Sequence, residues 1–96
     1  MKRFGISYLI EYHPRVLSED LPKLDHATLQ RIKVIIEKKL LLKPELFGAP
    51  LRRSLKGHRK LRTGDYRIIF RLKGNMIRIL IIEHRSMVYK RLLKRI

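Results

Sequence analysis

The chain has 96 residues, 45% of them hydrophobic, so it is long enough for one domain with a modest core and too apolar for an intrinsically disordered protein. It has no cysteine, which excludes disulfides and thiol chemistry, and no apolar run near the ~20 residues of a membrane span. Its 24 Lys and Arg against 8 Asp and Glu give a net charge of +16, which favours an anionic partner, either a nucleic acid or an acidic protein.

The positive charge is concentrated in the second half of the chain. Residues 56–96 hold thirteen Lys or Arg against two Asp or Glu, whereas residues 1–55 hold eleven against six. A solvated surface normally mixes both signs, and self-repulsion of this size opposes compaction until an anion offsets it. The second half is therefore expected to meet the anionic partner. No export signal is recognised, so we expect a cytoplasmic protein that makes no membrane contact.

The first half predicts a strand followed by two helices. Residues 4–12 are rich in aromatic and β-branched side chains that alternate along the segment, which is typical of a strand. Pro14 suits the first turn of a short helix, which Pro22 ends. A longer helix is predicted from about His26 to Leu42, because Asp25 can cap its N-terminus. Its apolar residues recur at the spacing of one helical face: Leu29, Ile32, Ile36 and Leu40.

The second half predicts a small antiparallel sheet. A connector over residues 44–57 contains two prolines and two glycines, and Gly-Asp and Gly-Asn turn sequences then separate three strands. These strands are predicted near residues 58–62, 66–72 and 77–83. The order β-α-α-β-β-β indicates a single α+β domain over residues 1–96, with the sheet packed on the two N-terminal helices. Residues 87–96 are predicted to form a short C-terminal helix.

Alternation of side chains along the strands predicts a basic sheet surface. Along residues 66–72 the even-numbered side chains are apolar and should meet the helices, whereas the odd-numbered ones include two arginines. Residues 77–83 are apolar on both parities, so that strand should be covered on both faces. It delivers His84, Arg85 and Tyr89 to the rim of the basic surface. Strand pairing is expected to bring five side chains together on one open surface: His58, Lys60, Arg62, Arg67 and Arg71.

Two segments carry a resemblance to a known family. KLRTGDYRIIF (residues 60–70) is followed at a characteristic distance by HRSMVY (residues 84–89). With the helix pair before them, these segments resemble the RelE branch of the RelE/ParE toxin superfamily over nearly the whole chain. The resemblance implies a small RNase-like α+β fold, and a toxin that cuts mRNA in the ribosomal A site. It also implies an acidic antitoxin that holds the toxin inactive, so mRNA, the ribosome and this antitoxin are the expected partners.

The same resemblance implies which residues act on RNA. The basic residue on the strand before the hairpin, the arginine after the turn, the arginine that ends the last strand and the late tyrosine all have matches here. His58 stands at a position where several relatives have lysine. The catalytic candidates are Lys60, Arg67, Arg85, Tyr89, His58 and His84. The candidates for RNA binding are Arg59, Arg62, Arg71 and Lys56.

The implied reaction is phosphoryl transfer within RNA. A ribose 2′-OH attacks the adjacent phosphorus, which leaves a 2′,3′-cyclic phosphate and a 5′-OH. Arg67 and Arg85 can bind the non-bridging oxygens, because guanidinium binds phosphate bidentately, and Lys60 can stabilise the charge that grows in the transition state. The general base stays open between the two candidate histidines and the tyrosine. No metal or other cofactor is expected, because cations supply the charge stabilisation and the sequence has no carboxylate cluster for Mg²⁺.

Two other functions stay open. A ParE-like toxin would inhibit DNA gyrase without catalysis of its own, although the basic rim residues and the late tyrosine favour the RelE interpretation. A non-catalytic RNA-binding module would bind RNA in a salt-dependent way without cutting it. The absence of paired aromatic residues in a stacking platform weakens this second alternative.

Overall fold

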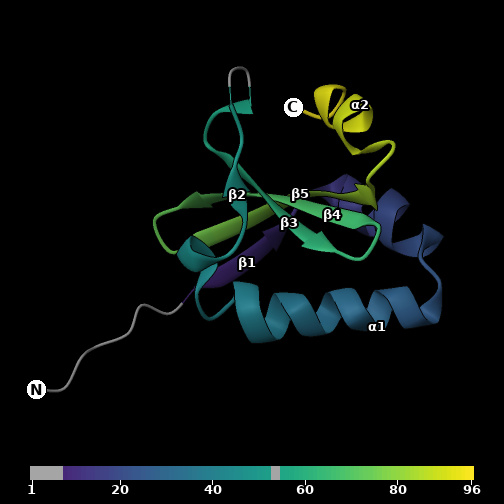
Figure 1. Ribbon diagram of the computed structural model, residues 1–96, viewed down its shortest axis with the longest axis horizontal. Helices are drawn as coiled ribbons and strands as arrows, with labels where there is room; N and C mark the ends of the chain where they lie inside the picture. The colour runs from purple at the N-terminus through teal and green to yellow at the C-terminus, as the bar shows by residue number, and fades with distance from the viewer. Residues whose placement is uncertain (1–7, 53–54) are drawn as a thin grey trace, which may run out of the picture.

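The computed structural model describes residues 8–52 and 55–96, which form three layers (Figure 1). A β-sheet forms the middle layer, α1 (His26–Ile35) covers one face and α2 (Val88–Leu93) lies over the other. The predicted α+β class and the short C-terminal helix are confirmed. The beginning of the first predicted strand, residues 4–7, lies outside the described residues.

The sheet has five strands in the order β1-β5-β4-β3-β2. Their bounds are Leu9–Tyr12 for β1, Ala49–Pro50 for β2, His58–Thr63 for β3, Tyr66–Lys73 for β4 and Met76–His84 for β5. The last three agree with the predicted strands to within one residue at each end. The two-residue β2 was not predicted, and it pairs antiparallel with β3 within the Pro- and Gly-rich connector.

One strand of the sheet runs parallel to its neighbour. β1 pairs with β5 in parallel, with Leu9 beside Met76 and Tyr12 beside Ile79, whereas the other pairs are antiparallel. The sheet is therefore mixed, and the antiparallel pairing predicted for the second half of the chain is confirmed in β3, β4 and β5. The helical layer between β1 and β3 returns the chain to its starting end, so β3 runs in the direction of β1. Two hairpin reversals later, β5 has that direction again.

The long helix begins at the predicted cap. The Asp25 carboxylate accepts a hydrogen bond from the Thr28 N–H at 3.2 Å, which satisfies one of the free donors of the first turn. The helix continues beyond Ile35 as a π-helical turn that ends at Leu40, two residues before the predicted end at Leu42.

Shorter helical turns flank α1. A π-helical turn over Val16–Asp20 and a 3₁₀ turn over Leu21–Lys23 take the place of the first predicted helix. Pro22 lies in the 3₁₀ turn, where its missing N–H costs no helical bond. A second 3₁₀ turn over Pro44–Leu46 leads from the end of α1 to β2.

The larger core lies between α1 and the sheet. Ile32, Ile36 and Leu40 are each at most 4% exposed, which confirms three of the four residues of the predicted apolar face, whereas Leu29 is only half-buried. They pack on the even-numbered residues of β4 and on β5, as the alternation predicts. The buried sheet residues of this core are Ile68, Phe70, Ile77, Ile79 and Ile82.

A second, smaller core lies on the opposite face, under α2. Val88 and Leu92 of the helix pack on Ile69, Leu80 and Ile81, and two leucines of the connector, Leu51 and Leu55, join them. A register shift between β4 and β5 at Ile69 explains why consecutive residues of β5 point to this one side. We expected this sheet surface to be open and basic. Its middle is instead covered by α2, which buries the apolar side chains of Ile69 and Ile81.

Candidate functional site

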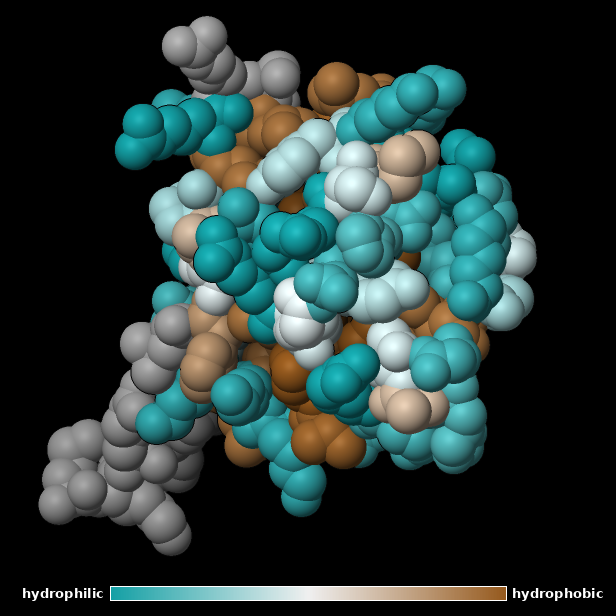
Figure 2. Space-filling view, turned by 45° about the vertical axis from the view of Figure 1, so that its right-hand side comes forward, coloured by the Kyte–Doolittle hydropathy of each residue, from teal (hydrophilic) through white to brown (hydrophobic). Residues whose placement is uncertain are grey.

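The basic residues of β3 and β4, apart from Arg59, share the face that α2 partly covers. In the register of the two strands, His58 pairs with Arg71, Lys60 with Ile69 and Arg62 with Arg67. The juxtaposition predicted from side-chain alternation is confirmed. Figure 2 shows hydrophilic side chains over most of the side in view, with apolar side chains exposed between them. Because like charges across a strand pair destabilise the sheet, this face is suited to an anionic ligand.

Helix α2 brings the late tyrosine over this face. The Lys60 ammonium lies 5.7 Å from the centre of the Tyr89 ring, which is within the range of a cation–π contact. Tyr89 is nonetheless 37% exposed, so its ring and hydroxyl stay open to a ligand. Residues 29 positions apart in the sequence are therefore placed in contact by the second core.

The β3–β4 turn gathers the two candidate arginines at one end of the same face. Arg67 Nη1 donates to the carbonyl oxygens of Gly64 at 3.0 Å and of Tyr66 at 2.9 Å. The Arg85 N–H donates to the Asp65 carbonyl at 2.7 Å, and its Nε lies 3.7 Å from the Asp65 carboxylate. Gly64 has a φ of +60°, which L side chains rarely adopt, so the glycine lets the turn take this shape.

We refer to Lys60, Arg62, Arg67, Arg85 and Tyr89 as the basic cluster. Among the described residues, one member of the cluster forms an ion pair: Arg85 pairs with Asp65, and both side chains are more than 60% exposed. Such a pair offsets little charge in water. The cluster thus keeps most of its positive charge for a ligand.

A buried ion pair holds the end of the chain, and with it α2, to the sheet. Arg95 bonds both oxygens of Asp20, at 2.6 and 3.0 Å, and each side chain is 1% exposed. The same carboxylate accepts the Ile82 N–H at 2.9 Å, and Arg95 Nη1 donates to the Leu80 carbonyl at 3.0 Å. Sequence reasoning missed this pair, because nothing local connects two residues 75 positions apart.

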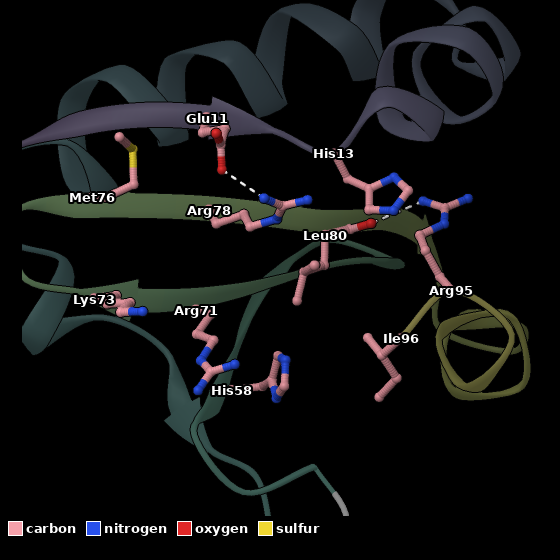
Figure 3. Close-up of a pocket in the computed structure, with 10 residues that line it drawn as sticks. All are labelled: Glu11, His13, His58, Arg71, Lys73, Met76, Arg78, Leu80, Arg95 and Ile96. Carbon is pink, nitrogen blue, oxygen red and sulfur yellow. Dashed lines mark hydrogen bonds and ion pairs between the residues drawn. The ribbon is translucent and has the colours of Figure 1, made fainter.

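His58 lies away from the β3–β4 turn, at the edge of a groove of about 510 Å³ (Figure 3). Its side chain is buried, and Nδ1 lies 3.2 Å from the Leu55 carbonyl oxygen. Since a carbonyl only accepts, Nδ1 carries the proton and Nε2 is the acceptor of the neutral ring. Arg71 lines the same groove, whereas none of the basic cluster does.

Three predicted residues lie apart from both sites. His84 was expected beside the basic surface, but its ring meets Tyr66 edge-on at 5.7 Å, and Tyr66 packs on the α1-side core. The parity of β5 places His84 on that face, so this expectation is wrong. Arg59 also points to the α1 side, where it donates to the Gly48 carbonyl at 3.3 Å. Lys56 is exposed in the turn before β3.

No group of three His, Cys, Asp or Glu side chains in the described ranges is arranged to hold a metal ion. No helix there has the length and apolar character needed to cross a membrane.

The sequence profile of the ParE toxin of type II toxin–antitoxin systems, parDE, matches residues 10–89. The chain belongs to this toxin family. The resemblance to the RelE/ParE superfamily is thereby confirmed, and the protein is the toxin of a type II toxin–antitoxin system. No curated protein sequence matches the toxin significantly.

The toxin is similar to several solved toxin structures. The toxin–antitoxin complex RelBE2 from Mycobacterium tuberculosis is 29% identical with a TM-score of 0.76, covering 83% of the toxin and 100% of that chain. A free Escherichia coli RelE with two arginines replaced by alanine is 22% identical with a TM-score of 0.69, covering 94% and 98%. Escherichia coli YafQ is 20% identical with a TM-score of 0.57, covering 85% and 98%. The latter two likenesses show the shared fold.

Proposed function

We propose that the toxin is an endoribonuclease that cuts mRNA in the ribosomal A site, in the cytoplasm. The observation that carries this proposal is the basic cluster: cations of β3 and β4 share one face of the sheet, Lys60 lies against Tyr89, and Arg85 at the end of β5 pairs with the exposed Asp65. Pre-organised cations stabilise the charge that develops on phosphate in the transition state, because they need no reorganisation during the reaction.

The proposed reaction is attack of a ribose 2′-OH on the adjacent phosphorus. The new O–P bond forms as the bond to the 5′-oxygen breaks, which leaves a 2′,3′-cyclic phosphate and a protonated 5′-OH. Arg67 and Arg85 bind the non-bridging oxygens through guanidinium N–H groups that the β3–β4 turn positions. Lys60 stabilises the additional negative charge, and each such donor is typically worth about 3–4 kcal/mol.

We assign proton abstraction from the 2′-OH to His58. Its Nδ1–H donates to the Leu55 carbonyl, which orients the ring and leaves Nε2 as the base. His58 lies two residues before Lys60 on the same face of β3, so both can reach one nucleotide. Tyr89 stacks on a base or protonates the leaving oxygen. His84 has no part in this scheme, because it lies on the other face of the sheet.

The proposal is tested by single-turnover cleavage of ribosome-bound mRNA. Lys60→Ala, Arg67→Ala and Arg85→Ala should each lose on the order of 10²-fold in rate, the scale of losing one transition-state donor. Arg31→Ala, on α1 beneath the opposite face, removes the same charge as a control and should cut at the wild-type rate. Circular dichroism checks the fold. Folded Arg67→Ala and Arg85→Ala proteins with wild-type rates would contradict the assigned site.

An acidic cognate antitoxin is the proposed partner. The RelBE2 complex and the RelB–RelE complex of Methanococcus jannaschii contain an antitoxin with the toxin. A net charge of +16 favours binding of an acidic chain, which would also raise the thermal stability of the toxin by mass action. Purification of the toxin with its neighbouring reading frame should recover a short acidic protein. Free, fully active toxin alone would count against this partner.

Inhibition of DNA gyrase is the second candidate function, because the matching profile is that of the ParE toxin. A gyrase supercoiling assay separates the two functions. The endoribonuclease proposal expects unchanged supercoiling and cut mRNA, whereas a gyrase inhibitor would block supercoiling and leave translated mRNA intact.

A further inference from the structure

The groove beside His58 is a second site on the α2 face. Strands β1, β3, β4 and β5 contribute residues to its lining together with the C-terminal end of the chain (Figure 3). One row across four strands runs through it: His58 beside Arg71, Arg71 beside Arg78, and Arg78 beside Glu11. Arginines directly opposite each other destabilise a sheet, so this row favours an anion between them.

The cations of the groove are only partly neutralised. Arg78 donates to Glu11 at 2.8 Å, and Arg95 is held by Asp20. Arg71 and Lys73 are exposed and have no ion-pair partner among the described residues. A phosphate can therefore bind at Arg71 without displacing an existing carboxylate.

The remaining lining suits a base or a ribose. Leu80, Met76 and Ile96 form an apolar surface beside the cations. The two histidines add opposite hydrogen-bonding groups: Nε2 of His58 accepts, whereas His13 accepts the Arg15 N–H at Nδ1, so its neutral ring donates through Nε2. A charged rim, an apolar floor and a few directed polar groups are the features of a small-ligand site.

We propose that the groove binds a nucleotide of single-stranded RNA that flanks the cleaved one, with its phosphate on Arg71 and its base against Leu80. This inference rests on the proposed endoribonuclease function and extends its substrate footprint. The His58 and Arg62 ends of β3 are about 13 Å apart at ~3.3 Å per residue, so one extended strand can occupy the groove and the basic cluster together. His58 lies at the junction of the two.

Binding of oligonucleotides without an attacking hydroxyl tests the groove apart from cleavage. The probes are fluorescent 2′-fluoro RNAs of two and six nucleotides, measured by anisotropy on the full-length toxin. Arg71→Gln should weaken hexanucleotide binding about tenfold, as expected for a charge-assisted hydrogen bond, and should change dinucleotide binding less than twofold. It should also lower the slope of log K against log salt by about 0.7, the loss of one single-strand phosphate contact. Arg31→Gln on α1 is the matched control and should change neither.

A second pair of variants tests the groove by adding a charge. Ile96 lines the groove at the exposed C-terminal residue, so Ile96→Glu places a carboxylate there without disturbing a core. It should weaken hexanucleotide binding as Arg71→Gln does. Leu93→Glu, on the exposed side of α2 and outside the groove lining, is its control.

Three results would overturn the inference. Equal losses for the dinucleotide and hexanucleotide would place Arg71 in the cleavage site, and equal losses for Arg71→Gln and Arg31→Gln would mean unspecific attraction. A deoxyhexanucleotide bound as tightly, with the same dependence on Arg71, would mean that the groove accepts any single strand, against RNA as its specific ligand class. Failure of the proposed function is separate: the wild-type toxin would then leave ribosome-bound mRNA intact while hexanucleotide binding still depended on Arg71.

Discussion

The two faces of the sheet bury apolar side chains in different ways. On the α1 face, a continuous apolar core extends from the helix to β4 and β5. On the α2 face, five buried residues form a small core in the middle, with the basic cluster at one end and the groove at the other. The α2 face thus has a smaller apolar core than the α1 face, and cations occupy both of its ends.

This difference shows how the basic face is stabilised. α2 has six residues, too few for a helix to be stable without tertiary contacts. Its own core is small, but the Asp20–Arg95 pair joins the end of the chain to the π-helical turn before α1. The face that would bind RNA therefore depends on a buried polar contact, whereas the α1 face depends on apolar packing.

The largest expected effect comes from breaking this pair. Arg95→Ala leaves the Asp20 carboxylate buried without its cation, which typically costs about 3–5 kcal/mol of unfolding free energy. Arg91→Ala removes the same charge from pairs with Glu19 and Glu83 in which the Arg91 side chain is 25% exposed, and should cost about 1 kcal/mol or less. Urea unfolding measures both. Equal losses for the two variants would contradict a special role of the buried pair.

A smaller effect is expected from pH on the same face. Burial lowers the pKa of His13, and the nearby cations Arg95, Arg78 and Arg15 lower it further, against a weaker opposing effect of Asp20. The unfolded chain therefore binds this proton first, so the unfolding free energy should fall as the pH drops below the usual histidine value of 6.5. His13→Gln should flatten the dependence of the urea midpoint on pH between about 7 and 5. An unchanged slope would show that His13 does not control it.

The smallest expected effect lies at the start of α1. Hydrogen bonding to Thr28 lowers the pKa of the Asp25 carboxyl below its ordinary 3.8. The cap therefore contributes its full stability above that value and loses it as the pH falls through the lower folded pKa. Asp25→Ala should lower the urea midpoint at pH 7, whereas Asp25→Asn, which retains a capping oxygen, should lower it less. Equal midpoints for Asp25→Ala and wild type at pH 7 would argue against the cap.

Much of the fold could be predicted because its signals are local. The Asp25 cap, the apolar face of α1 and the alternation along β4 each depend on residues a few positions apart. The direction of β1 and the location of His84 could not be predicted in the same way. β1 and β5 pair although they are far apart in the sequence, so no local signal sets their relative direction. A register shift near Ile69 breaks the simple alternation of side chains along β5 and so changes the face on which His84 lies.

The sequence by itself determined which cations share a face of β3 and β4, since successive side chains of a strand point to opposite sides. Only the tertiary structure decided how that face is divided. It places Tyr89 over Lys60, buries Arg95 against Asp20 and separates His58 from the β3–β4 turn. These contacts join residues up to 75 positions apart, so they exist only after two cores have packed on one sheet.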